Sequence, residues 1–555
     1  MEFPESRLET DNSHCKYDSS FVNTDESATG EASVVTGPFP LRCLSPWPVC
    51  AGTLFVFIST YLLTQDLFIL NEARSYFVNG GWTSGITASQ YWLFPAGYNT
   101  RFTSMFFANF VTHACGVSIG CTNMLQSCLV ALAFGAIVIH TFQLVGSLRL
   151  TFFVAGLWAL SAPALSGAIW QSIQHDKIAL ILTMLTLTLS VEFFSRGNRS
   201  RWEDGSCSLV LTGLFAVAFN AKEVAFLLPI CGVFLAVILS MKSGGSVVRS
   251  LLVMTLPMAY SAWFIGFYLI HLDSTWANHI SGGSPLAGAR TLLLLSLNLG
   301  NFLNLGQWGD YNKAALGVAK HLYLTFVVVL AVLALYRALK WRRPKTGFIA
   351  GARNAALTHW RELYLLLICS VSQAAFARTA VPSAFYMMIP FWSGTLLIIL
   401  ILRILVAAIP RPRLAFGFLL VLMAAPLLVS YTTQYGPGGA VRRLLQSSHS
   451  LETSFGAIRV LLPVGQVKAI RMSVAGTPDC SWYLLHGVRG ENLDADLGPY
   501  IFNKLSARPI MIDGNDPARI AKPPLPGEAD IRLADDYSLL SVSFDGKLVF
   551  RHPEP

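Results

Sequence analysis

Long apolar segments recur through the middle of the chain. Residues 47–65, 122–146 and 383–402 are the clearest of them, and each has about the 20 residues that an α-helix needs to cross a bilayer. Segments of the same kind continue to residue 432, and together they predict about eleven membrane-spanning helices. The predicted spans lie near 47–65, 122–146, 151–169, 178–194, 205–220, 224–241, 250–271, 319–338, 362–379, 383–403 and 413–432.

The two ends of the chain have a different character. Residues 1–46 are polar and acidic, with few apolar positions, which is typical of a disordered tail. Residues 436–555 carry acidic and basic residues in near balance, as a soluble domain does. Within them, polarity alternates over Val542–Phe550 on both sides of Asp545–Gly546, a strong signal for a β-hairpin. We therefore expect an all-α polytopic membrane domain over 47–435 and a small β-rich domain over 436–555.

The composition agrees with this division. Only 13% of the 555 residues are charged and the mean hydropathy is +0.52, whereas soluble domains have about 25% charged residues. The net charge of +9 is spread along the chain rather than gathered on a soluble surface, which argues against nucleic acid as a partner. The ten cysteines form no evident framework, and without a CxxC motif neither a thiolate zinc site nor a redox pair is expected.

Basic residues orient the predicted spans, because cytoplasmic loops carry an excess of lysine and arginine. The richest loop, 337–361, contains no acidic residue before Glu362, and Arg196, Arg199 and Arg201 fall on the same side. This orientation predicts an integral membrane protein with a cytoplasmic N-terminal tail and, after an odd number of spans, an extracytoplasmic C-terminal domain. Leu286–Leu305 is also apolar, but a further span would place 337–361 outside. We interpret it as a helix lying on or dipping into the outer face.

The acidic residues of the predicted membrane domain fall into two groups. One group lies near the basic cytoplasmic loops, and the other lies on the outer side. The outer group consists of Asp66, Glu72, Asp176, Glu223, Asp273 and Asp310. Asp66 ends the first predicted span between apolar residues, where a carboxylate becomes a stronger base.

Basic residues on the outer side break the charge rule and need another explanation. They are Arg74, Arg101, Lys177, Lys222, Arg290, Lys313, Lys320 and Arg378, joined by His175, His271 and His321. An anionic lipid phosphate at the interface is one explanation, because such residues are the usual phosphate ligands. The alternative is that they are solvated loop residues or pair with each other. For the neighbours Lys222 and Glu223, that alternative is a buried structural ion pair.

The order of these features resembles the C-type glycosyltransferase superfamily, and most closely its bacterial protein-mannosyltransferase-like members. The resemblance covers roughly residues 47–240. The matching segments are Gln65–Glu72 in the first outer loop, Tyr98–Phe102, Trp170–Leu180, Asn220–Glu223 with Pro229, and later Ala377–Arg378 with Tyr386–Pro390. The family carries a pair of acids in the first loop and a proline after the arginine. Here Gln65 replaces the first acid and Phe102 replaces the proline.

The resemblance implies an inverting transfer of a sugar from a polyprenyl-phosphate donor to a hydroxyl of a glycan, lipid or protein, on the external face of the bacterial inner membrane. Asp66 would be the catalytic base, with Glu72 as the alternative. The substrate-binding set would be Arg101, His175, Asp176, Lys177, Lys222, Glu223 and Arg378. Some family members use a divalent metal beside the acid pair. Because one acid is replaced, we expect no metal and no other cofactor.

Two other functions remain open on the sequence. The replacement by Gln65 fits a catalytically inactive homologue that serves as an assembly subunit. A transporter or lipid flippase would often show inverted repeats with matching broken helices, and none is evident in the sequence.

Overall fold

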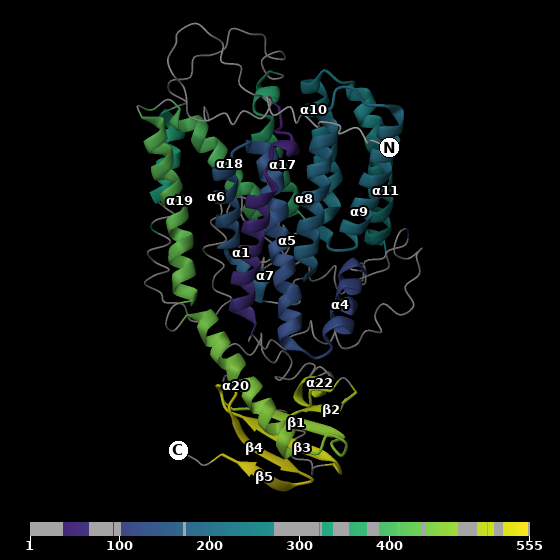
Figure 1. Cartoon of the computed structure of the whole chain (residues 1–555), viewed down its shortest axis with the longest axis vertical. Helices are drawn as coiled ribbons and strands as arrows, with labels where there is room; N and C mark the ends of the chain where they lie inside the picture. Colours follow the sequence, from purple (N-terminus) through teal and green to yellow (C-terminus); the bar gives the residue numbers. More distant parts are fainter. Residues whose placement is uncertain are drawn as a thin grey trace, which may run out of the picture.

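The computed structural model describes residues 37–65, 93, 102–169, 174–270, 321, 325–336, 354–374, 388–407, 409, 411–435, 439–475, 497–504, 506–507, 509–514 and 525–552. They form a bundle of helices that continues, at one end, into a small domain containing a β-sheet (Figure 1).

Seven helical segments in this part of the chain are long and apolar enough to cross a membrane. Each coincides with one of the predicted spans. They are α1 (Pro46–Thr64), α5 (Ile119–Val145), α8 (Gln174–Phe194), η6 with α10 (Glu223–Leu227 and Leu228–Ser243), α11 (Val247–Ile270), α18 (Met388–Val406) and α19 (Pro412–Tyr435). The class predicted from the sequence, a mostly helical membrane protein, is therefore supported.

The predicted number of about eleven spans is not confirmed. Residues 151–169 form two shorter helices, α6 (Leu148–Ala159) and α7 (Ala162–Ile169). The remaining three predicted spans correspond to α9 (Arg201–Phe219), to a short apolar helix (Thr325–Tyr336) and to α17 (Trp360–Ala374). The break before α7 has a local cause, because the Ser161 hydroxyl accepts a hydrogen bond from the N–H of Ala164, as an N-cap does. Leu286–Leu305 lies outside the described residues.

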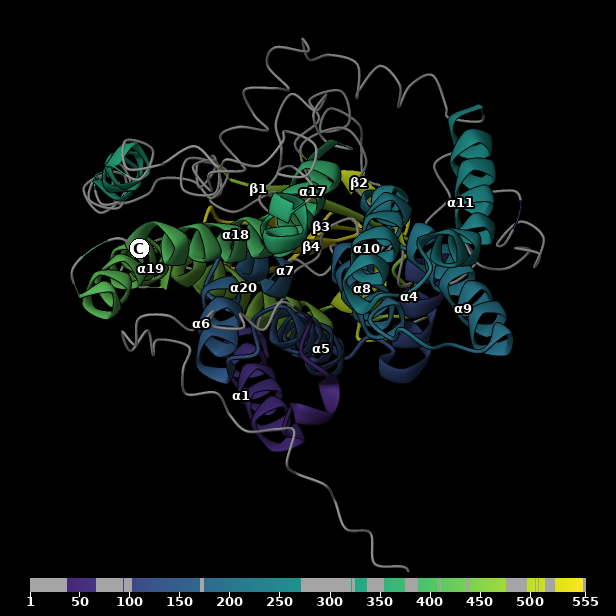
Figure 2. The ribbon, with the colours of Figure 1, turned by 90° about the horizontal axis from the view of Figure 1, so that it is seen from above.

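Helix α5 occupies the centre of the packing. It contacts α1, α4 (Phe102–Cys115), α6, α7 and α8, and most of its side chains are buried. Helices at the edge instead expose large apolar side chains, such as Phe55 of α1 and Val248 of α11, as expected of surfaces that face lipid. Figure 2 shows α9 and α11 at one edge of the bundle and α19 at the opposite edge.

The end of α5 holds the segment that leads into α1. Gly146 caps α5 at φ 68°, a left-handed conformation that favours glycine. A Cβ there would lie 2.3 Å from the Phe39 ring. The N–H of Phe39 donates to the carbonyl of Gln143 at 2.9 Å. Residues 1–36 of the predicted tail lie outside the described residues, but from Gly37 onward the chain is already packed on the bundle.

The C-terminal domain has two layers. Its sheet contains β1 (Ala469–Val474), β2 (Ile510–Asp513), β3 (Glu528–Leu533), β4 (Leu539–Phe544) and β5 (Lys547–Arg551) in the order β2-β1-β3-β4-β5. Strand β1 runs parallel to β2 and β3, and the pairs β3–β4 and β4–β5 are antiparallel. Helix α20 (Ala440–Leu461) contacts α19, β4 and the short α22 (Leu497–Ile501). Apolar residues of α20 and alternate strand residues form one core.

The predicted hairpin is confirmed. Asp545 and Gly546 connect β4 to β5 with φ of 50° and 73°, and two positive φ values identify the turn that matches strand twist. The expectation of a β-rich domain is incomplete, because α20 supplies a helical layer that the alternating positions in the strands do not indicate.

The bundle has two chemically different ends. Helix α4 lies at the end that faces the C-terminal domain (Figure 1). Hydrogen bonds join its first turn to Gln174 at the start of α8 and to Asn220 and Ala221 before η6. Val117, between α4 and α5, and Ile119, the first residue of α5, pack against the core of that domain. Arg149, Arg199 and Arg249 lie at the opposite helix ends. His175, Asp176, Lys177 and Lys222, which the sequence assigned to the outer side, therefore share an end with the C-terminal domain.

Candidate functional site

Buried and partly buried polar side chains gather at the end of the bundle that faces the C-terminal domain. They come from the start of α4, the first turns of α5 and α8, and the turn that precedes η6. The outermost of these segments are joined by a hydrogen bond between residues 117 apart along the chain, and the helix packing brings them together. The polar cluster, as we call it, consists of Ser104, Gln126, Gln174, His175, Asp176, Lys177 and Lys222.

Lys177 is at the first turn of α8 and is 1% exposed. Its ammonium group donates to Oε1 of Gln126 and to the carbonyl oxygen of Gly167 in α7, each at 2.7 Å. A buried ammonium group without such acceptors would be very costly. Lys177 thus connects three helices, and two of its three N–H donors are used inside the protein.

A series of amides extends from Lys177 toward α4. Nε2 of Gln126 donates to Oε1 of Gln174 at 3.3 Å, and Nε2 of Gln174 donates to the carbonyl oxygen of Ser104 at 3.2 Å. The Ser104 hydroxyl in turn donates to the carbonyl oxygen of Ala221 at 3.2 Å. Because Ala221 immediately precedes Lys222, the series ends at the second buried lysine.

Lys222 and Asp176 form a buried pair. Nζ of Lys222 lies 4.0 Å from Oδ2 of Asp176, with only 2% and 5% of the two side chains exposed. Nε2 of His175 lies 3.1 Å from the same carboxylate oxygen, and 17% of the histidine side chain is exposed. His175 is therefore the most accessible of these three groups.

Several predicted site residues lie outside the described part of the chain. These are Asp66, Glu72, Arg101 and Arg378, and for Glu223 only its backbone at the start of η6 is described. The neighbours of two of them are described. Nδ2 of Asn123 donates to the carbonyl oxygens of Thr64 and Gln65, at 2.5 and 3.3 Å, and Asn123 is one helical turn from Gln126. The chain next to Asp66 is therefore held on the same face of α5 as the polar cluster.

The chain next to Arg101 is held in the same way. Thr103 donates from its N–H to the carbonyl oxygen of Asn220 at 3.0 Å and from its hydroxyl to that of Val217 at 2.9 Å. The structure thus brings together His175, Asp176, Lys177 and Lys222, and it fixes the segments that lead to Asp66 and Arg101 beside them.

The polar cluster contains groups for two kinds of chemistry. A carboxylate and an imidazole transfer protons, and ammonium groups stabilise negative charge on a phosphate. The same contacts also build a buried ion pair of Lys222 with Asp176. The structural pair considered from the sequence is with Glu223, whose side chain lies outside the described residues. Among the described residues, no group of three or more His, Cys, Asp or Glu side chains could hold a metal ion.

Sequence reasoning missed the amide members of the polar cluster. Asn123 and Gln126 are three residues apart near the start of a predicted span, and this spacing places them on one face of a helix. Polar side chains in a membrane helix are a functional signal, so both positions were open to detection. Gln174 and Ser104 carry no such signal, because their importance lies in contacts between segments.

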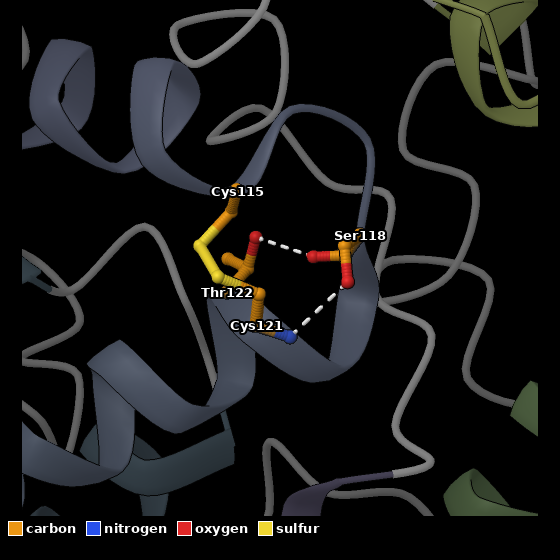
Figure 3. Close-up of a disulfide and its surroundings, with 4 residues drawn as sticks. All are labelled: Cys115, Ser118, Cys121 and Thr122. Carbon is orange, nitrogen blue, oxygen red and sulfur yellow. Dashed lines mark hydrogen bonds between the residues drawn. A yellow bond between two sulfur atoms is a disulfide. The ribbon is translucent and has the colours of Figure 1, made fainter.

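Sequence reasoning also missed a disulfide. Cys115 ends α4 and is bonded to Cys121 in the first turn of α5. Figure 3 shows Ser118 across the turn from the disulfide, with its hydroxyl accepting from the N–H of Cys121 and its carbonyl accepting from the Thr122 hydroxyl. Ser118 is thus the N-cap of α5 inside a turn closed by the disulfide.

The C-terminal domain has a separate hollow of about 270 Å³ whose lining includes Lys468 and Lys504.

No model of a known protein family matches the chain, and no curated protein sequence matches it either.

Proposed function

We propose that the protein is a membrane glycosyltransferase that moves a sugar from a polyprenyl-phosphate donor to a hydroxyl acceptor, with inversion at the anomeric carbon. The observation that carries the proposal is the burial of Asp176, Lys177 and Lys222 in one polar cluster, next to the chain segments that lead to Asp66 and Arg101. If these residues were independent loop residues, no such convergence would be expected.

In the proposed reaction, Asp66 accepts the proton of the acceptor hydroxyl as its oxygen attacks the anomeric carbon. The bond from that carbon to the phosphate oxygen breaks, and the polyprenyl phosphate leaves with the electron pair. Lys222, His175 and Arg101 would stabilise the charge on the leaving phosphate. Lys177 would hold α5, α7 and α8 in place, because its N–H groups already bind Gln126 and Gly167.

The proposed topology has eleven spans, a cytoplasmic N-terminus and an extracytoplasmic C-terminal domain. It counts α6 with α7, α9, Thr325–Tyr336 and α17 as spans in addition to the seven long helices. Its support is the separation of the polar cluster from the basic helix ends, which the positive-inside rule assigns to the cytoplasm. Disulfides do not distinguish the two orientations, because Cys43, at the opposite end from Cys115, is also disulfide-bonded.

An inactive assembly subunit is the second candidate, and Gln65 favours it. The backbone carbonyl of Gln65 accepts from Asn123, so this position would still be held at the site even without an acidic side chain. Such a subunit would keep the arrangement of helices and lose one acid of the pair in the first outer loop.

The test is transfer of radiolabelled sugar from a polyprenyl-phosphate mannose, with the purified protein in lipid nanodiscs. Asp66→Asn keeps the shape and removes the base, and we expect a loss of roughly a hundredfold to ten-thousandfold in rate. Glu72→Gln is the matched control in the same loop. Full activity in both variants would exclude a first-loop carboxylate as base. No transfer by the unmodified chain with any such donor would favour the inactive subunit.

A further inference from the structure

The C-terminal domain touches the bundle at the turn that the disulfide closes. Residues 116–118 connect α4 to α5, and Cys115–Cys121 joins the two helices across them (Figure 3). Val117 and Ile119, in and beside this turn, pack against the core that α20 and the sheet share. The described contacts therefore dock the domain on a covalently closed turn, in addition to its attachment through α19 and α20.

The other end of α4 is attached to the polar cluster. Thr103 and Ser104 make three hydrogen bonds to the backbone of Val217, Asn220 and Ala221, directly before Lys222. The carbonyl oxygen of Ser104 also accepts from Gln174, which lies directly before the His175–Asp176–Lys177 segment. The first turn of α4 thus holds both backbone segments that carry the charged members of the cluster.

Between these attachments α4 is a single helix, Phe102–Cys115, and 14 residues of α-helix are about 21 Å long. Ala108, Val111 and Cys115 form a small buried group with Leu125 of α5 nearby. Because α4 packs against α5 and is attached at both ends, we expect it to move as one rigid body. A displacement of one end of α4 would then also displace the other end.

We propose that α4 transmits the position of the C-terminal domain to the polar cluster, and that Thr103 and Ser104 are the positioning residues for Lys222 and Gln174. A ligand or partner that shifts the C-terminal domain would then shift the candidate site, to the extent that it binds one arrangement better than the other. This inference rests on the location of the site proposed above and is independent of the reaction performed there.

Hydrogen exchange of the full chain in nanodiscs, followed by mass spectrometry, tests the link without an activity readout. Val117→Asp with Ile119→Asp places charge in the docking contact. We expect exchange to rise about tenfold over residues 117–121 and also over 217–224. Val460→Asp is the control, because Val460 of α20 is 87% exposed and such a change should leave both segments as protected as before.

Two further variants decide the outcome. Ser104→Ala removes the bond to Ala221, and we expect faster exchange over 217–224 while 117–121 stays protected. If the variant with Val117→Asp and Ile119→Asp fails to fold, Cys115→Ser with Cys121→Ser opens the same turn without adding charge. The same rise in exchange over 217–224 is then expected. Faster exchange at 117–121 with unchanged protection over 217–224 would overturn the link. A transferase failure with the exchange pattern intact would refute only the proposed function.

Discussion

The buried pair of Lys222 and Asp176 is the most consequential side-chain contact in the polar cluster. Removing two charged groups from water is expensive, and their attraction offsets that cost only while both are present. The Asp176 carboxylate also lies 3.1 Å from Nε2 of His175, so it interacts with both the lysine and the histidine. A change at one of the three residues therefore alters the environment of the other two.

Replacing one partner of this pair should destabilise the protein more than replacing both. We expect Lys222→Met to cost about 3 kcal/mol, because it leaves a carboxylate buried without its cation. Adding Asp176→Asn should recover part of that loss, which a double-mutant cycle of unfolding in detergent would measure. The exposed pair of Arg196 and Glu192 is the matched control and should show a coupling of about 0.5 kcal/mol or less. Strictly additive effects at Lys222 and Asp176 would show that they do not interact.

In the C-terminal domain, two aspartates should give opposite pH dependence. The hydroxyl and N–H of Ser538 both donate to Oδ1 of Asp536, at 2.6 and 2.9 Å, and they lower the pKa of that carboxyl below 3.8. Its stabilising contribution is therefore present above the unfolded value and lost as pH falls through the lowered pKa. Burial raises the pKa of Asp530 instead, although Arg532 and Arg471 oppose the shift.

We expect Asp536→Ala to cost the domain about 1 kcal/mol at neutral pH, with the difference shrinking on acidification. Asp530→Asn should act in the reverse sense and stabilise the domain at neutral pH, because it removes a carboxylate that burial disfavours. Exchange protection of residues 525–552 in the full chain, corrected for intrinsic rates at each pH, measures both. Equal pH profiles for the two variants would contradict this assignment.

The membrane helices are joined by polar contacts as well as by apolar packing. His140 of α5 is fully buried, with Nε2 3.0 Å from the Tyr364 hydroxyl of α17 and Nδ1 3.2 Å from the Thr188 hydroxyl of α8. Burying an apolar side chain between two helices gives little free energy when the alternative is contact with lipid. Hydrogen bonds between helices therefore add specificity to the packing. These contacts select which helix faces meet.

Replacing His140 should therefore weaken the association of three helices. We expect His140→Leu to cost about 1–3 kcal/mol, because two buried hydroxyls lose their partner. Tyr364→Phe should then cost less in that background than in the unmodified chain. Thr186→Val is the control, since the Thr186 hydroxyl donates within its own helix, to the carbonyl oxygen of Leu182. Thermal unfolding in detergent provides the comparison, and equal losses for His140→Leu and Thr186→Val would show that the contact is not stabilising.

Considered as a whole, the chain separates its charges between the two ends of the bundle. Among the described residues, Arg149, Arg199 and Arg249 lie at the ends opposite the C-terminal domain, and the polar cluster lies beside that domain. Loops rich in lysine and arginine remain in the cytoplasm during insertion. In the proposed topology, this asymmetry of the whole molecule, rather than any single loop, would set the orientation in the membrane.

Reporter fusions measure this orientation directly. A phosphatase fused after Ser450 should be active, because we expect that position to be extracytoplasmic, and one inserted within 340–360 should be inactive. Green fluorescent protein at the same sites should give the reverse result. A cytoplasmic signal after Ser450 would overturn the proposed topology and with it the external location of the polar cluster.

Features that depend on neighbouring residues could be predicted from the sequence. The seven long apolar helices follow from the thickness of the hydrocarbon core, which requires about 20 apolar residues per span. The hairpin of β4 and β5 follows from Asp545–Gly546, whose positive φ values are a local preference. Both are properties of short segments, so their type is readable without knowledge of the rest of the fold.

The candidate site could be predicted only in part. The sequence indicates three members of the polar cluster as charged residues beside apolar spans, namely Asp176, Lys177 and Lys222. Ser104 and Gln174 have no distinguishing feature in the sequence, and only the packing places them against Gln126 and Ala221. The break between α6 and α7, the layer formed by α20, and the disulfide at the docking turn were likewise not predicted. Each depends on which segments meet in space, and contacts between distant segments are selected by packing and burial over the whole chain, which no local periodicity encodes.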